Sequence, residues 1–180
     1  MTENEFKVML TKEQYEKLLG LYDFVTFTQT NHYYDTAGLE MSARHITVRV
    51  RELDGGFFLQ MKLPTDTEFS RTELSREISA LPEALSGAEL SELAGGEFPD
   101  VKRLGSLTTV RSVWKFDGGE TDLDRSSYFG KTDFELEIEF TDEQAARDVL
   151  AKLRRELGLS QSGEICAGKV RRFLEEYKKT

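Results

Sequence analysis

Strict alternation of acidic and apolar side chains between residues 134 and 140 is the feature that most constrains the fold. The run reads Phe-Glu-Leu-Glu-Ile-Glu-Phe. Because successive side chains of a β-strand point to opposite faces, Glu135, Glu137 and Glu139 share one face and the apolar residues share the other. Three carboxylates in a row repel each other unless something cationic lies in front of them. Hard divalent cations take oxygen ligands of this kind, so this strand predicts a metal site.

The same alternation recurs along the chain and predicts an α+β fold. Glu3, Glu5 and Lys7 share a face of the opening strand. Hydrophobic periodicity and turn signals predict strands at residues 1–9, 24–35, 45–53, 57–63, 71–79, 107–115, 121–128 and 134–140, and helices at residues 12–21, 82–93, 143–157 and 165–178. Asp54-Gly55-Gly56 and Asp117-Gly118-Gly119 predict hairpin turns. No repeat or linker appears, so residues 1–180 are expected to form one domain.

Composition excludes several classes of protein. The net charge of −9 argues against partners such as nucleic acid or an acidic membrane surface. No apolar run approaches the length of about 20 residues that a membrane-spanning helix needs. Cys166 is the only cysteine, which rules out a disulfide within the chain and predicts a cytoplasmic location.

The polar faces of the predicted strands are unusually rich in charge. They carry Glu3, Glu5, Lys7, Arg49, Arg51, Lys62, Glu73, Arg111, Lys115, Asp122, Asp124, Glu135, Glu137 and Glu139. For any single strand, a face open to water explains such residues. Taken together, they favour a barrel of about eight strands whose charged faces turn inward and line a tunnel. Arginine on such a face suits the bidentate binding of phosphate.

The order of these residues resembles the CYTH domain, also called the triphosphate tunnel metalloenzyme superfamily. The resemblance covers nearly the whole chain. Within the family, the chain is most similar to small bacterial single-domain members, which are often labelled adenylate cyclases. It rests on Glu3-x-Glu5-x-Lys7, Asn31-His-Tyr-Tyr-Asp35, Arg49-Val-Arg51, Lys62, Arg71-Thr-Glu73, Arg111, Asp124, Glu135-Leu-Glu137-Ile-Glu139 and Lys169.

The resemblance implies an eight-stranded antiparallel β-barrel that forms a tunnel, with helices packed outside. By position, the triphosphate would be held by Lys7, Arg49, Arg51, Lys62, Arg111 and Lys169, with Glu73 among the substrate-binding residues. Mg²⁺ or Mn²⁺ would be held by Glu3, Glu5, Asp124 and two of the three late glutamates, either Glu135 with Glu137 or Glu137 with Glu139. Glu5, Lys7 and Glu137 would be the catalytic residues, with Glu5 or a neighbouring carboxylate taking a proton from the attacking water.

The expected function is metal-dependent hydrolysis of a small-molecule triphosphate. The substrate would be inorganic tripolyphosphate or an organic triphosphate such as thiamine triphosphate or a nucleotide. A class IV-type adenylate cyclase that makes cyclic AMP from ATP is the alternative, because it needs the same metal and phosphate contacts. A non-catalytic sensor of nucleotides or polyphosphate is a second alternative, although so many carboxylates suit anion binding poorly. The protein is expected to be a monomer or a homodimer.

Overall fold

The computed structural model describes residues 4–65, 71–159 and 167–180. Glu3, Cys166 and the predicted start of the last helix at residue 165 lie outside the described residues. Within the described ranges, no helix is long and apolar enough to cross a membrane.

Nine strands and five helices make up the described chain. The strands are β1 (Glu5–Leu10), β2 (Val25–Asp35), β3 (Thr47–Leu53), β4 (Gly56–Pro64), β5 (Arg71–Ile78), β6 (Ala84–Leu85), β7 (Val101–Phe116), β8 (Gly119–Tyr128) and β9 (Lys131–Phe140). The helices are α1 (Lys12–Leu19), α2 (Glu40–Ala43), α3 (Gly87–Ala94), α4 (Glu143–Leu157) and α5 (Lys169–Tyr177).

The strands form one sheet whose hydrogen-bonded order is β1-β9-β8-β7-β2-β3-β4-β5, with β6 paired to β7. The strand pairs β1–β9, β8–β9, β2–β3, β3–β4 and β4–β5 are all antiparallel. The predicted α+β class, built on an antiparallel sheet with a few helices, is therefore confirmed.

The chain divides into two compact units. The first unit comprises Gln29–Thr108 and Phe173–Thr180, and the second comprises the described part of Glu3–Thr28 together with Thr109–Arg172. Strands β2 and β7 and helix α5 each contribute residues to both units. Each unit has a hydrophobic core of its own.

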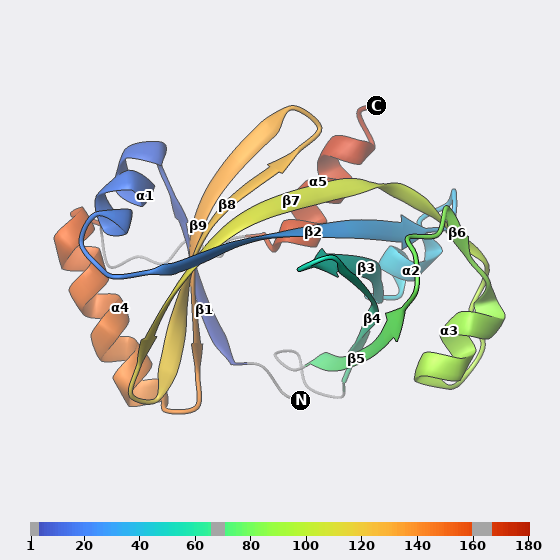
Figure 1. The fold of residues 1–180 in the computed structure, drawn as a ribbon, viewed down its shortest axis with the longest axis horizontal. Coiled ribbons are helices and arrows are strands. Elements are labelled where there is room, and N and C mark those ends of the chain that lie inside the picture. The colour runs from blue at the N-terminus through green and yellow to red at the C-terminus, as the bar shows by residue number, and fades with distance from the viewer. Residues whose placement is uncertain (1–3, 66–70, 160–166) are drawn as a thin grey trace. The chain divides into compact units, whose positions relative to one another are not determined.

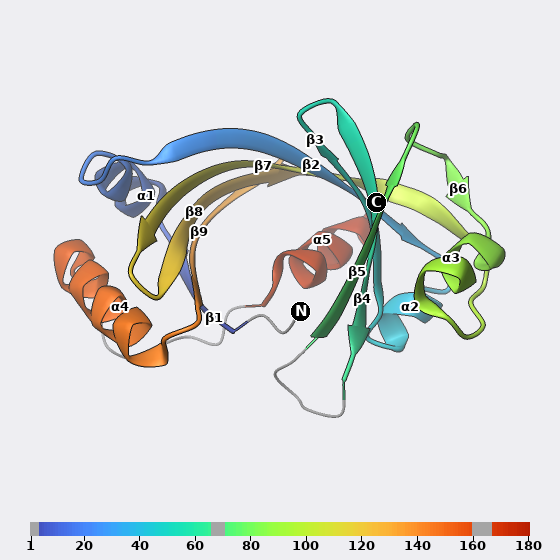
Figure 2. The ribbon, with the colours of Figure 1, turned by 60° about the horizontal axis from the view of Figure 1, so that its bottom comes forward.

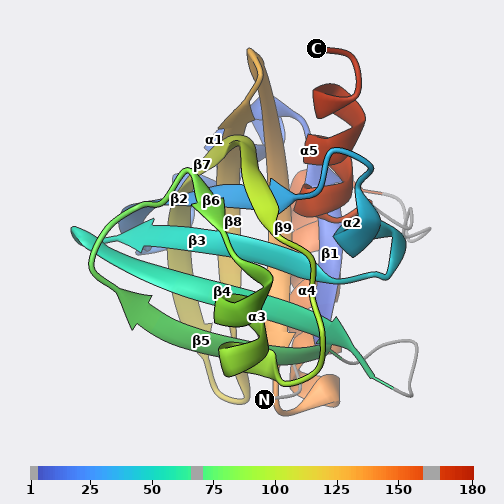
Figure 3. The ribbon, with the colours of Figure 1, turned by 90° about the vertical axis from the view of Figure 1, so that its right-hand side faces the viewer.

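The core of the first unit forms between helix α3 and the sheet. Alternation along β3 and β4 directs Val48, Val50, Leu59 and Met61 to one face, where they are buried with Leu90 of α3. Figure 3 shows α3 lying across β4 and β5 on this side. Burial of each such side chain stabilises the fold by about 1.5–3 kcal/mol. The charged residues at the alternate positions are thereby turned to the opposite face.

The second unit repeats this plan with β8, β9, α1 and α4. Leu123, Leu136 and Ile138 are buried together with Leu18 of α1 and Leu153 of α4. Figures 1 and 2 both show α1 and α4 side by side. The apolar residues of β9 thus lie on the helix-covered face, as the alternating sequence predicts, and its glutamates lie on the other.

Capping and turn residues fix the helix and hairpin ends. Asp142 caps α4, since its carboxylate accepts hydrogen bonds from the backbone amides of Gln144 (2.9 Å) and Ala145 (3.1 Å). Asp54 and Gly55 both have positive φ, 50° and 78°, at the predicted β3–β4 hairpin. The helix predicted to begin at residue 143 and the hairpin turn predicted at Asp54-Gly55-Gly56 are confirmed.

One predicted element was wrong in its extent. Residues 82–93 were expected to form one helix, but Ala84–Leu85 form β6 and the helix begins at Gly87. Ser86 and Glu89 form a capping box, in which each side chain binds the other residue's backbone amide. Leu85 is buried opposite Val101, so tertiary packing favours the strand. Strand β7 consequently begins six residues earlier than the predicted strand at residue 107.

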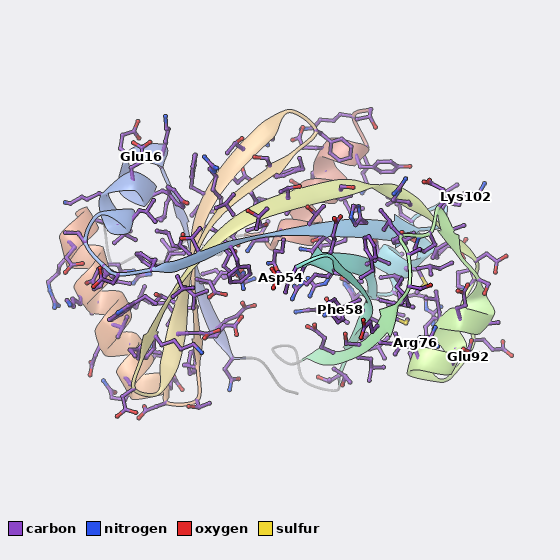
Figure 4. The ribbon with its side chains drawn as sticks, viewed as in Figure 1. Glu16, Asp54, Phe58, Arg76, Glu92 and Lys102 are labelled. Atoms are coloured by element: carbon purple, nitrogen blue, oxygen red, sulfur yellow. The ribbon has the colours of Figure 1, made fainter. Side chains whose placement is uncertain are left out.

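Ion pairing on the helix side joins α3 to the sheet. Arg76 of β5 lies 3.1 Å from Glu92 of α3, and both residues are labelled in Figure 4. Both side chains are substantially exposed, so the pair adds little to stability.

Gly87→Ala is predicted to destabilise the first unit. A Cβ atom at Gly87 would lie 1.9 Å from the carbonyl oxygen of Phe98, so the backbone has to shift. We expect a loss of about 1–3 kcal/mol, measured as the free energy of unfolding in urea. Gly20→Ala is the control, since Gly20 has φ −84° and only ordinary contacts at 3.6–3.7 Å. Equal stability of the two variants would contradict this account of Gly87.

Candidate metal and phosphate site

Pairing of β8 with β9 builds a cluster of three buried carboxylates in the second unit. The antiparallel register sets Asp124 opposite Glu135, with Glu137 two residues further along the same face. These side chains each offer an oxygen, and the three oxygens lie within 4.8 Å of one another. The residues are only 0%, 1% and 4% exposed, respectively. Asp124, Glu135 and Glu137 are called the carboxylate cluster below.

Such a cluster needs cations, because two carboxylates at this separation repel by roughly 3 kcal/mol at an effective dielectric constant of about 20. Lys169, the first residue of α5, lies 2.8 Å from Asp124 Oδ2 and 3.0 Å from Glu137 Oε2, and also pairs with Glu135. Arg111 of β7 donates to both oxygens of Asp124 (2.9 and 2.7 Å) and to Glu137 (2.7 Å). Both cations are therefore held inside the cluster.

Strand β1 adds a third cation. Lys7 is opposite Glu137 in the β1–β9 register, and its Nζ lies 2.8 Å from Glu137 Oε1 and 3.1 Å from Glu5 Oε1. The Glu5 side chain is 31% exposed, far more than the cluster residues. Glu139, opposite Glu5, borders this group but is not one of the three clustered carboxylates.

Arg172 was not predicted as a site residue. It pairs with Asp133 (2.8 Å) and with Glu135 from the same helix as Lys169. The signal was present in the sequence, because residues three apart on a helix lie on one face. The basic run Lys169-Val-Arg171-Arg172 is equally typical of a solvated helix end, and only the tertiary structure separates these two interpretations.

Burial and ion pairing shift the pKa values of Glu137 and Glu135 in opposite directions. Burial alone would raise the pKa of Glu137, but Lys169, Lys7 and Arg111 outweigh it and hold that pKa well below the usual range. Burial raises the pKa of Glu135, and Lys169 opposes this rise only in part. Glu137 is thus held in the charged form more firmly than Glu135.

Asp122 provides a test of whether these residues suit a metal ion. Burial raises its pKa to about 7, and the charges of Asp124 and Glu139 add to the rise that Arg111 opposes. Within the described chain, neither carboxylate oxygen of Asp122 receives a hydrogen bond, although the side chain is almost completely buried. Its contact with a cation is an ion pair with Arg111. Oδ1 of Asp122, a buried oxygen without a hydrogen bond beside the carboxylate cluster, fits a hard divalent cation, which binds oxygen ligands.

A separate group of charges lies on the polar face of the first unit. Arg49, Arg51, Lys62 and Glu73 are called the cationic cluster below. Glu73 Oε2 lies 2.9 Å from Lys62 Nζ, and Glu73 Oε1 lies 3.4 Å from Arg49 Nη2. Burial would raise the pKa of Glu73, but Arg49 and Lys62 lower it below its ordinary value. Glu73 therefore holds two cations of adjacent strands in fixed positions.

Polar side chains orient the two arginines of this cluster. Arg49 Nε donates to Gln60 Oε1 at 2.8 Å, across the β3–β4 pair. Arg51 Nε donates to Asn31 Oδ1 at 3.2 Å, across the β2–β3 pair. A hydrogen bond through Nε fixes the plane of a guanidinium group, and arginine binds anions through such a planar fork of N–H groups.

The predicted site residues thus fall into two sets. The second unit brings together Glu5, Lys7, Arg111, Asp124, Glu135, Glu137 and Lys169, and the first unit brings together Arg49, Arg51, Lys62 and Glu73. Glu139 borders the first of these sets, and Glu3 lies outside the described residues. The functional roles of all these residues stay predictions.

Known proteins share both the sequence and the fold of this chain. A Bacillus subtilis protein described as "Putative triphosphatase YjbK" is 30% identical over 197 aligned positions, covering 99% of this chain and 97% of that protein. A solved structure from Bacillus halodurans, described as a "putative adenylate cyclase", is 26% identical with a TM-score of 0.74, covering 95% of this chain and 96% of that one. A Hippeastrum structure, described as a "putative adenylyl cyclase" with a dominant triphosphatase activity, shares the fold at 23% identity and a TM-score of 0.73, covering 98% and 96%. Residues 1–167 match the sequence model of the CYTH domain, and the chain therefore belongs to the CYTH domain family.

Proposed function

We propose that this protein is a metal-dependent hydrolase of triphosphates. Its substrate would be inorganic tripolyphosphate or an organic triphosphate such as thiamine triphosphate or a nucleotide. The observation that carries the proposal is the carboxylate cluster, where buried acidic oxygens within 4.8 Å of one another are interleaved with lysine and arginine. The description of the Bacillus subtilis relative as a triphosphatase supports the same activity.

The carboxylate cluster would hold Mg²⁺ or Mn²⁺, together with Glu5 and, at its border, Glu139. Glu3 belongs to this proposed ligand set by its place in the sequence. When bound, such an ion neutralises phosphate charge and lowers the pKa of a coordinated water molecule. Lys169, Lys7 and Arg111 keep Glu137 in the charged form that a metal ligand requires.

The lysines and arginines would bind the phosphate oxygens. Arg49, Arg51 and Lys62 of the cationic cluster suit this role because they place three cations on one face of the sheet, with Glu73 between Arg49 and Lys62. Glu73 would act as a positioning residue that orients Arg49 and Lys62. Lys7, Arg111 and Lys169 of the second unit would likewise bind phosphate oxygens.

Glu5 is the residue best suited to accept a proton. Its carboxylate is partly exposed, and Lys7 Nζ lies 3.1 Å from its Oε1. Lys7 also contacts Glu137, so it fixes the two carboxylates relative to each other. Glu5 would accept the proton of the attacking water, as general-base catalysis requires.

An adenylate cyclase is the second candidate, because the 26% identical Bacillus halodurans protein carries that description. A cyclase would use the same carboxylates and cations. The ribose 3′-hydroxyl would replace water as the nucleophile, and pyrophosphate would leave in place of orthophosphate.

Turnover should depend on a divalent metal and should release orthophosphate. We expect purified protein with Mg²⁺ or Mn²⁺ to release orthophosphate from tripolyphosphate, ATP or thiamine triphosphate, and to lose this activity in EDTA. Cyclic AMP should be absent when ATP is the substrate. Release of pyrophosphate together with cyclic AMP would favour the cyclase. If neither orthophosphate nor pyrophosphate is released from any of these triphosphates, both proposed activities are refuted.

Glu137→Gln should lower kcat by about a hundredfold or more, because a neutral amide replaces the central anionic ligand. Circular dichroism should show that the variant remains folded, since glutamine keeps the shape and an acceptor oxygen. Glu143→Gln on α4 is the matched control, because its side chain is 58% exposed and pairs with Arg147 of the same helix. Full activity of Glu137→Gln would refute the assigned metal site.

Arg51→Ala should act mainly on substrate binding. Loss of a charge-assisted hydrogen bond to phosphate costs about 1.5–3 kcal/mol, so KM should rise roughly 10- to 100-fold with a smaller change in kcat. Arg76→Ala removes the same charge from β5 on the side that faces α3, and it should leave KM unchanged. The assignment fails if the two variants have the same KM.

A further inference from the structure

Lys169, in the first turn of α5, places its ammonium group among the three carboxylates of the cluster. Lys169 Nζ contacts all three cluster residues, at 2.8 Å from Asp124 and 3.0 Å from Glu137, with Glu135 as its third partner. Its side chain is only 13% exposed. No other lysine among the described residues pairs with all three of these carboxylates.

A divalent cation would need the same oxygens. Magnesium binds carboxylate oxygens at about 2.0–2.1 Å, which places the ion among the three side chains where the ammonium now lies. Two positive groups cannot occupy that position, and even neighbouring positions are disfavoured by charge repulsion. Either the ion is excluded or Lys169 moves.

We propose that Lys169 is a resident counter-ion of the carboxylate cluster, and that a divalent cation binds there by displacing its ammonium group. The proposal rests on the metal site of the proposed function. The cluster is neutralised by Lys169 in the metal-free protein and by the ion in the metal-loaded protein. The first turn of α5 is then the part of the second unit that changes between these states.

Lys169 is the cation best placed to leave. It is the first residue of a nine-residue helix, and its side chain is a flexible stem that carries a point charge. Arg111, by contrast, projects from the interior of β7 and holds Asp124 through two hydrogen bonds. A bidentate arginine on a strand has little freedom to withdraw, so it stays with the cluster.

The rest of α5 has anchors that do not involve the ammonium. Arg172 holds Asp133 at 2.8 Å in the second unit. Phe173 is completely buried in the first unit, where its ring centroid lies 4.7 Å from that of Tyr33. Displacement of Lys169 therefore requires only a local change at the start of the helix, where the amide of Arg172 donates to the carbonyl of Gly168 at 3.1 Å.

The released ammonium would be free to bind a phosphate oxygen. Metal binding would then supply a cation to the substrate, and triphosphate would in turn favour metal binding, because such coupling is reciprocal. Lys169 would oppose the metal in the absence of triphosphate and assist binding of the triphosphate once metal is present. A purely structural lysine would show no such reversal.

Lys169→Met should therefore tighten metal binding to the substrate-free protein. We expect isothermal titration with Mn²⁺ to give a Kd about tenfold lower than wild type. Lys178→Met is the matched control, because it removes the same charge from an exposed position near the end of the same helical segment and should leave Kd unchanged. Lys169→Arg keeps the charge, so its Kd should equal or exceed that of wild type.

A second measurement does not rely on a variant. Hydrogen exchange of wild-type protein should show faster exchange of the Arg172 amide with saturating Mg²⁺ than without it, since its bond to Gly168 loosens. An unchanged or weaker Mn²⁺ affinity in Lys169→Met, with wild type still binding the ion, would overturn this inference alone. Absence of Mn²⁺ binding in both proteins would overturn the metal site and the proposed function with it.

Discussion

Neutralisation of buried carboxylates is the constraint on which the second unit depends. Asp124, Glu135 and Glu137 lie close together with almost no exposure to water, an arrangement that is unstable without positive charge. The cations come from β1, β7 and α5, three elements that are distant in the sequence. The same electrostatic demand therefore brings these distant segments together.

The sheet makes this arrangement possible because one of its faces is apolar and the other is charged. In both units the apolar face packs under helices and provides the stability, while the opposite face holds charge. In the first unit, Glu73 sets the positions of Arg49 and Lys62, so its cations are ordered before any ligand arrives. Preorganised cations of this kind lose less entropy when they bind an anion.

Period-two alternation made most of the fold predictable from the sequence, together with the face of the sheet on which many candidate site residues lie. It correctly assigned the face of Glu135 and Glu137, because a one-residue error would bury charge in the core. It could not predict β6, which exists because Leu85 packs against Val101, nor the pairing of Arg172 with Glu135. Those features depend on contacts between segments far apart in the chain, for which a local pattern carries no signal.

The register of β1 against β9 has a consequence for how the protein is made. Glu5 pairs with Glu139, so the second unit joins the start of the chain to a strand beyond residue 130. All of the first-unit segment Gln29–Thr108 is synthesised between them. During synthesis, β1 cannot pair with β9 until that whole segment and β9 itself have emerged from the ribosome. The β3–β4 hairpin, by contrast, can close over its short loop as soon as β4 emerges. The β1–β9 pair is thus among the last contacts of the sheet to form.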